Sequence, residues 1–329
     1  MVVFCGKKHG NNKIGTIHTL KRNIIFEETS LYRAPFRVRG FEFGAGEKSA
    51  CIVGNMRGNE VQQIYICSQL VKHLKRLEEQ GRIHQGHSIL VIPSVNPYSV
   101  NSKERFWPID KTDINRMFPG YDLGETTQRI AAGVFEVIKD YQYGIQFSSF
   151  YMPGRFMPHV RMMKTGYENV EMAKQFGMPY VVQRKIRPYD TTTLNYNWQL
   201  WDTNAYSIFS TSTTEIDEKS AKDAVHSVLR FLAKQGIIDY TTHNGYISSV
   251  VTDTDMISVR TKTAGIFESK IEVGTEVVTG QLLAQIIDPL EGEVKEELRS
   301  PVDGIVFFGH NDPLTYANTA VFKIISGNE

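Results

Sequence analysis

Residues 49–81 read SACIVGNMRGNEVQQIYICSQLVKHLKRLEEQG, and this stretch decides the fold. Its first part, SACIVGN, is a short apolar run that predicts a buried strand. Apolar residues then recur at helical spacing from Val61 to Leu77, and Gly81 is a plausible C-terminal stop for that helix. A strand followed directly by an amphipathic helix is the repeating unit of α/β domains.

The same alternation continues along the chain on both sides of this stretch. Further strands are predicted at FRVRGFEFG (36–44), HSILVIPSVNP (87–97), YGIQFSSF (143–150), PYVVQ (179–183) and AYSIFSTSTTE (205–215). Helices are predicted at 127–140, 168–177 and 220–236. This order predicts an α/β domain with a largely parallel or mixed sheet. Residues 1–31 fit an N-terminal extension or edge strands.

The pattern changes near residues 238–245. From Asn244 onward there is no helical period, but there are many short β-type runs with glycine turns. Two parts, 264–286 and 300–324, form a quasi-repeat that resembles the small β-sandwich of lipoyl and biotinyl carrier domains. The turn between them, IDPLEGEVK (287–295), has no lysine flanked as a carrier lysine would be, which favours a packing module. The predicted division is therefore 1–31, 32–240 and 244–329.

Composition excludes several classes of protein. The formal net charge is +1 with no long run of like charges, which argues against nucleic-acid and anionic-membrane partners. The three cysteines are too few and scattered for a disulfide framework, so we expect Cys51 and Cys67 to be buried thiols. Neither a signal peptide nor an apolar run of about 20 residues is evident, so we expect a cytoplasmic protein.

Four polar motifs follow one another in a specific order. The segment GNMRGNE (54–60) comes directly after the first buried strand, and Asn96-Pro97 ends a later one. DINRMFPG (113–120) and Thr214-Glu215 then follow. A glycine-rich strand-to-helix turn alone is common, whereas this order and spacing are much more specific.

In these motifs the chain resembles the succinylglutamate desuccinylase/aspartoacylase family of zinc-dependent deacylases, with DINRMFPG as the most specific match. The resemblance implies a zinc carboxypeptidase-like α/β/α sandwich with a mixed sheet and a small C-terminal all-β domain. It also implies cleavage of the amide bond of N-acyl amino acids. Zinc held by two histidines and a glutamate leaves a position open for water and lowers the pKa of that water to roughly 7.

The resemblance assigns the metal side of the site to four positions. Glu60 retains the zinc glutamate, but the two zinc histidines fall on Arg57 and Ser148, and the orienting aspartate falls on Gln146. A guanidinium has no acceptor and would repel a dication, and a neutral hydroxyl is a poor zinc ligand. We therefore expect no zinc site of the family type, and expect Arg57 to pair with Glu60.

The substrate side is better preserved. The catalytic glutamate falls on Glu215, although the expected glycine two residues later is Asp217. Arg116 retains the carboxylate-binding arginine, with Asn115 beside it, and Arg105 occupies a second basic position typical of the family.

Three functions stay open at this point. The chain is an active hydrolase with a rearranged site that uses Glu215 and His159, or it binds a small anion or N-acyl amino acid without hydrolysis. The second case includes a regulatory subunit paired with an active paralogue. The third is a scaffold whose β domain mediates homo-oligomerisation.

Overall fold

The structure, a computed structural model, describes residues 21–327 and is built around one nine-stranded mixed sheet. The strand order is β1-β2-β4-β3-β5-β9-β7-β8-β10. The strands are β1 (Lys21–Glu28), β2 (Phe36–Gly44), β3 (Gly46–Asn55), β4 (Gly86–Ser94), β5 (Tyr143–Phe147), β7 (His159–Met163), β8 (Tyr180–Arg184), β9 (Asn204–Phe209) and β10 (Ser249–Thr252). The central strands β4, β3, β5 and β9 run parallel, so their carboxyl ends meet at one edge.

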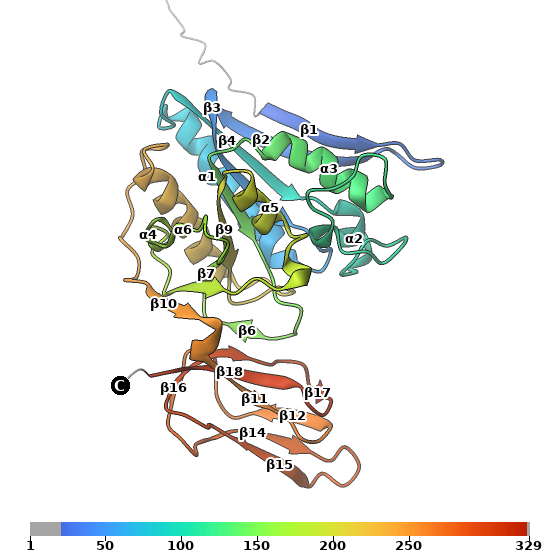
Figure 1. The fold of residues 1–329 in the computed structure, drawn as a ribbon, viewed down its shortest axis with the longest axis vertical. Helices are drawn as coiled ribbons and strands as arrows, with labels where there is room; N and C mark the ends of the chain where they lie inside the picture. The colour runs from blue at the N-terminus through green and yellow to red at the C-terminus, as the bar shows by residue number, and fades with distance from the viewer. Residues whose placement is uncertain (1–20, 328–329) are drawn as a thin grey trace, which may run out of the picture.

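Helices cover both faces of this sheet (Figure 1). Helices α1 (Val61–Glu79) and α6 (Glu218–Lys234) share one apolar core with the face that carries Ile52. Helices α3 (Thr126–Ile138) and α5 (Leu194–Leu200) cover the opposite face, where Cys51 lies. Adjacent residues of a strand point to opposite faces of the sheet. Cys51 and Ile52 of β3 are therefore both buried, each beneath a different layer of helices. The predicted α/β/α sandwich with a mixed sheet is confirmed.

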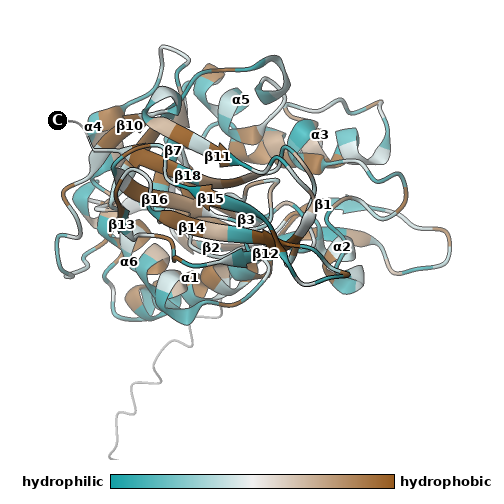
Figure 2. Cartoon of the chain, turned by 90° about the horizontal axis from the view of Figure 1, so that it is seen from below, coloured by the Kyte–Doolittle hydropathy of each residue, from teal (hydrophilic) through white to brown (hydrophobic). Residues whose placement is uncertain are grey.

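The C-terminal β domain consists of two antiparallel sheets, β11-β18-β16-β13 and β15-β14-β12-β17. Its strands are β11 (Met256–Arg260), β12 (Gly265–Ser269), β13 (Glu276–Val277), β14 (Leu282–Ile287), β15 (Val294–Arg299), β16 (Gly304–Gly309), β17 (Leu314–Thr315) and β18 (Ala320–Ser326). Each half of the quasi-repeat contributes one short strand to the sheet of the other half: β13 pairs with β16, and β17 pairs with β12. This exchange agrees with the quasi-repeat in the sequence. Figure 2 shows the strands of this domain in front of the large sheet, with apolar residues along β14, β16 and β18.

The two parts of the chain are tied together by two strands. Strand β6 (Arg155–Phe156) lies in the chain between β5 and β7 of the large sheet, but it pairs with β16 of the β domain. Strand β10 follows the predicted boundary at residue 244, yet it pairs with β8 of the large sheet. Phe156, Phe307 and Phe308 pack together in one buried cluster at this junction.

Several elements differ from the sequence prediction. Strand β9 ends at Phe209, so 210–215 is not strand; the Ser210 hydroxyl donates to Ser212 O, and Thr211 N donates to Ser220 Oγ, which diverts the backbone from the sheet. Strand β7 was not predicted, because His159 and Arg161 interrupt its apolar pattern. Residues 21–28 form the edge strand β1, one of the two alternatives considered for 1–31, and residues 1–20 lie outside the described part.

Two further sequence expectations concern cysteines and membranes. Cys51 and Cys67 are buried free thiols, as predicted, and Cys5 lies outside the described residues. None of the helices formed by residues 21–327 combines the length and the apolar character needed to cross a bilayer.

Candidate functional site

Glu60 lies at the carboxyl edge of the sheet, in the turn between β3 and α1, and its carboxylate is fully engaged. One oxygen, Oε2, accepts hydrogen bonds from the backbone N–H groups of Met56 and Arg57, each at 3.0 Å. The other, Oε1, accepts from Arg57 Nη1 at 3.1 Å and from the Ser149 hydroxyl. The residue is 1% exposed. No oxygen of Glu60 is left without a protein donor.

Arg57 lies between two carboxylates. Besides Glu60, it donates from Nε and Nη2 to Asp113 Oδ2, at 3.0 and 2.8 Å. Burial would lower the pKa of Arg57, but the charges of Glu60 and Asp113 outweigh it and raise that pKa above its usual value. The predicted Arg57–Glu60 pair is confirmed, and it is part of a buried triad. Asp113 was not predicted as its third member, although it opens the DINRMFPG motif.

Asp113 also connects the triad, through hydrogen bonds, to Asn115 and Gln146. Its other oxygen, Oδ1, accepts from Asn115 N at 3.1 Å and caps the short 3₁₀ helix η1 (Ile114–Arg116). Asn115 Oδ1 in turn accepts from Gln146 Nε2 on β5 at 3.0 Å. Gln146, on which the resemblance places the orienting aspartate, thus donates a hydrogen bond from its amide to Asn115. The network joins β3, η1 and β5, so it fixes the relative position of three segments.

Arg105 is held beside the triad by a close backbone contact. Gly58 N donates to Arg105 O at 3.3 Å, and a Cβ at Gly58 would lie 2.2 Å from the Ser99 carbonyl. Only glycine fits this approach. Burial lowers the pKa of Arg105, and repulsion by Arg57 lowers it further. Within residues 21–327 the Arg105 guanidinium has no carboxylate in ion-pair contact; its one polar contact there is Phe150 O at 3.5 Å.

The Arg116 side chain is held by two residues that were not predicted, Tyr189 and Asp190. Its Nη1 lies 3.6 Å from Asp190 Oδ1 and donates to Tyr189 O, and its guanidinium stacks over the Tyr189 ring at 5.2 Å. Both partners belong to the short helix η2 (Pro188–Asp190). The Arg116 side chain is one-third exposed and so remains accessible to a ligand.

Three predicted residues stand apart from this network. In the described part of the chain, the Ser148 hydroxyl forms no hydrogen bond, and the adjacent Ser149 reaches Glu60 instead. Glu215 is exposed on the turn after β9, with no hydrogen bond or ion pair to any described residue. His159 is fully buried and stacks on Phe209 at 4.6 Å. Burial, and then the charge of Arg161, lower the pKa of His159.

The zinc implied by the family resemblance does not fit these residues. Glu60 has both oxygens bonded to protein donors, and the Arg57 guanidinium lies against it. Ser148 offers only a neutral hydroxyl. Residues 21–327 contain no group of three or more histidine, cysteine, aspartate or glutamate side chains placed to hold a metal ion.

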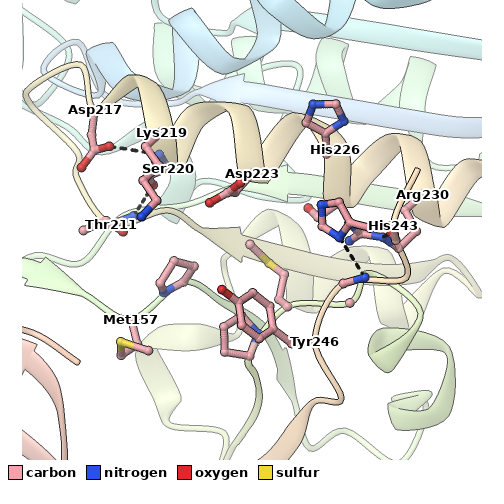
Figure 3. A pocket seen from close by; sticks show the side chains of 16 residues that line it. Met157, Thr211, Asp217, Lys219, Ser220, Asp223, His226, Arg230, His243 and Tyr246 are labelled. Carbon is pink, nitrogen blue, oxygen red and sulfur yellow. Dashed lines mark hydrogen bonds between the residues drawn. The ribbon is translucent and has the colours of Figure 1, made fainter. Parts of the chain in front are cut away.

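A hollow of about 660 Å³ lies elsewhere, along α6. Figure 3 shows Asp223, His226 and Arg230 on this helix, with His243 and Tyr246 of the following loop across the hollow. Asp217, which caps the N-terminus of the helix, lies at one end. None of the residues predicted for the site line this hollow. Its mixture of carboxylates, imidazoles and a guanidinium defines no reaction.

Comparison with known proteins places this geometry in context. Residues 47–205 match the family model of the succinylglutamate desuccinylase/aspartoacylase catalytic domain. The N-alpha-acetyl-L-2,4-diaminobutyric acid deacetylase of Halomonas elongata is 22% identical over 293 residues, covering 78% of this chain and 76% of its own.

Solved structures of low sequence identity share the fold. A succinylglutamate desuccinylase/aspartoacylase from Rhodobacter sphaeroides gives a TM-score of 0.77 at 21% identity, with 93% of this chain and 96% of that chain covered. The product-bound ectoine utilization protein from Ruegeria pomeroyi gives 0.75 at 19% identity, with 89% and 90% covered. The similarity therefore extends through both the large sheet and the β domain.

Proposed function

We propose that this chain, whose residues 47–205 match the catalytic-domain model of the succinylglutamate desuccinylase/aspartoacylase family, acts as a ligand-binding member of that family. It binds a small carboxylate of the N-acyl amino acid class beside Arg57, without zinc-dependent hydrolysis. The observation that carries this proposal is the buried triad of Arg57, Glu60 and Asp113. Its Arg57 guanidinium lies at the position that the resemblance assigns to the first zinc histidine. Because Glu60 and Asp113 neutralise that guanidinium, Arg105 and Arg116 are the cations that remain for a ligand carboxylate.

Carboxylate binding is supported by the cations that remain beside the triad. Arg105 has no carboxylate partner within residues 21–327, so its donors are available to a ligand. Arg116 is partly exposed and shares its carboxylate, Asp190, with Arg184. Guanidinium groups bind carboxylates through paired, charge-assisted hydrogen bonds. The named deacetylase among the relatives favours an N-acetylated amino acid as the ligand.

The loss of hydrolysis follows from the same contacts. Water that is not bound to a metal has a pKa of about 15.7, so it is a poor nucleophile at neutral pH. The Glu60 carboxylate has no free oxygen to accept a proton from such a water. Glu215 lies on an exposed turn, where no described residue orients it. Binding without turnover is the function that this arrangement supports.

Calorimetric titration with N-acetyl-L-2,4-diaminobutyrate and N-acetyl-L-aspartate tests the proposal. We expect Arg105→Gln to weaken binding at least about tenfold, because it removes a charge-assisted contact. Asp223→Asn, in the hollow along α6, is the matched control and should bind as the wild type does. Zinc-dependent release of amine that is lost in Glu60→Ala would contradict the proposal, as would binding that Arg105→Gln leaves unchanged.

A further inference from the structure

The large sheet meets the C-terminal β domain at one end of the molecule (Figure 1), and a second group of basic side chains lies at this junction. Arg161 comes from β7, Arg184 from the end of β8, and Lys323 from β18 of the β domain. Arg161 and Lys323 both lie against the ring of Phe150, at 4.2 and 5.9 Å from its centroid. Strands β7 and β8 are paired, with Met163 opposite Arg184. Three positive charges from three strands therefore meet at one junction.

Arg161 is a buried cation without a counter-ion. It is 9% exposed, and its guanidinium lies over the adjacent rings of Phe150 and Phe209, at 4.2 and 4.3 Å from their centroids. Its Nε is buried and has no hydrogen-bond partner, and no carboxylate within residues 21–327 forms an ion pair with it. Its one polar contact there is His159 Nε2 at 3.4 Å. His159 Nδ1 lies 2.8 Å from Met157 O, so it carries the proton and Nε2 is the acceptor.

The neighbouring cations are also short of negative charge. Arg184 Nε is buried without a partner, and its Nη2 lies 3.3 Å from Asp190 Oδ2, a carboxylate that also serves Arg116. Lys323 forms no ion pair with any residue of the described range 21–327. Burial lowers the pKa of Lys323, and repulsion by Arg161 lowers it further. The Asp253 carboxylate attracts Arg161 and Lys323 but makes no ion pair with either of them in the described part of the chain.

The geometry points to a binding site for an oxyanion, a phosphate or carboxylate group, held jointly by Arg161, Arg184 and Lys323. Buried donors in native proteins are almost always satisfied, so two adjacent guanidinium groups with unpartnered Nε atoms indicate a missing acceptor. An arginine fork suits the planar edge of an oxyanion, and a lysine supplies a point charge. This site goes beyond the proposed function, because its three side chains are different from Arg57, Arg105 and Arg116, which the proposed function uses.

The position of the site suggests what the anion would do. Lys323 belongs to the β domain, whereas Arg161 and Arg184 belong to the large sheet, so one bound anion would link the two. Phe150 joins this junction to the candidate functional site, because its carbonyl accepts from Arg105 while its ring covers Arg161. Neutralising the three charges would remove their mutual repulsion and stabilise the docking of the β domain.

Thermal unfolding of the full-length protein in inorganic phosphate, with ionic strength held constant by sodium chloride, tests the site. We expect the unfolding midpoint to rise with the logarithm of phosphate concentration, as for any ligand of the native state. Lys323→Gln and Arg184→Gln should raise the phosphate concentration needed for a given rise at least about tenfold. Lys270→Gln, which removes a partly exposed lysine of the same β domain, is the matched control and should respond as the wild type does.

The arms of the experiment separate the possible outcomes. Acetate in place of phosphate shows whether a carboxylate serves as well, and stabilisation by either anion that depends on Lys323 supports the site. An equal response of Lys323→Gln, Arg184→Gln and Lys270→Gln would overturn it, and so would a midpoint that phosphate and acetate raise no more than chloride does. Arg105→Gln should leave this response intact, which distinguishes the result from failure of the proposed function.

Discussion

Removing the Arg57 guanidinium should destabilise the fold strongly, because it leaves two carboxylates without their cation. In Arg57→Met, three hydrogen bonds to Glu60 and Asp113 are lost, and the side chains involved are only 7%, 1% and 15% exposed. Removing one partner of a buried ion pair costs about 3–5 kcal/mol. Glu60 keeps two backbone donors and the Ser149 hydroxyl, so the lower end, about 3 kcal/mol, is expected.

Urea denaturation measures this free energy, and calorimetry should show a midpoint lower by about 4 °C. The double variant Arg57→Met/Glu60→Gln should lose less than the sum of the single variants, with a coupling of about 1–3 kcal/mol. Lys48→Met is the matched control, since Lys48 pairs with Asp140 at the surface, where the two side chains are 43% and 60% exposed. That change should cost less than about 1 kcal/mol. If Arg57→Met unfolds like Lys48→Met, the triad does not stabilise the site and the reasoning is refuted.

Three further predictions follow from the described contacts. The double variant Arg57→His/Ser148→His should acquire zinc measurable by elemental analysis, because it completes a ligand set of two imidazoles and one carboxylate, whereas Arg57→His alone should not. Equal zinc in both variants would show that Ser148 is not at a ligand position. Burial and Arg161 lower the pKa of His159 in the folded state, so below about pH 6.5 the unfolded chain binds a proton that the folded chain does not. The free energy of unfolding should therefore fall as the pH drops below about 6.5, by at most about 1.4 kcal/mol per pH unit. His159→Phe should flatten this dependence, and denaturation at about pH 5 and about pH 7.5 would reveal the difference. Gly58→Ala should destabilise by about 1–3 kcal/mol and weaken ligand binding, because its methyl group would meet the Ser99 and Glu104 carbonyls at 2.2 and 2.4 Å; a stability equal to that of the wild type would mean that the turn can move away from Ser99.

The sequence predicts most of the sheet because its central strands contain short runs of buried apolar residues. The predicted strand 36–44 coincides with β2, and the helix after Glu60 coincides with α1 to within two residues. Strand β10, by contrast, has only four residues, and its place beside β8 depends on the path of the loop that follows α6. Such pairing between distant segments leaves no local period to detect.

The candidate site shows the same division between local and distant contacts. The Arg57–Glu60 pair follows from a spacing of three residues, and the structure confirms it. Asp113 is 56 residues away from Arg57, and Asp190 is even more distant from Arg116 in the chain, so neither pairing has a signal in the sequence. The Glu215 assignment placed that residue at the end of a strand, but β9 ends at Phe209. Its catalytic role remains a prediction.

The charges around the triad constrain what can bind there. Arg57 and Arg105 together balance Glu60 and Asp113, so the innermost part of the site is close to neutral. An incoming carboxylate therefore needs a further cation, and Arg116 is the accessible one. Arg116 can turn toward a ligand only by giving up part of its contact with Asp190, which would leave that carboxylate to Arg184. A ligand at the triad would thereby reduce the excess positive charge at the proposed oxyanion site of Arg161, Arg184 and Lys323. The two sites should therefore compete: phosphate should weaken carboxylate binding in the wild-type protein but not in Arg184→Gln.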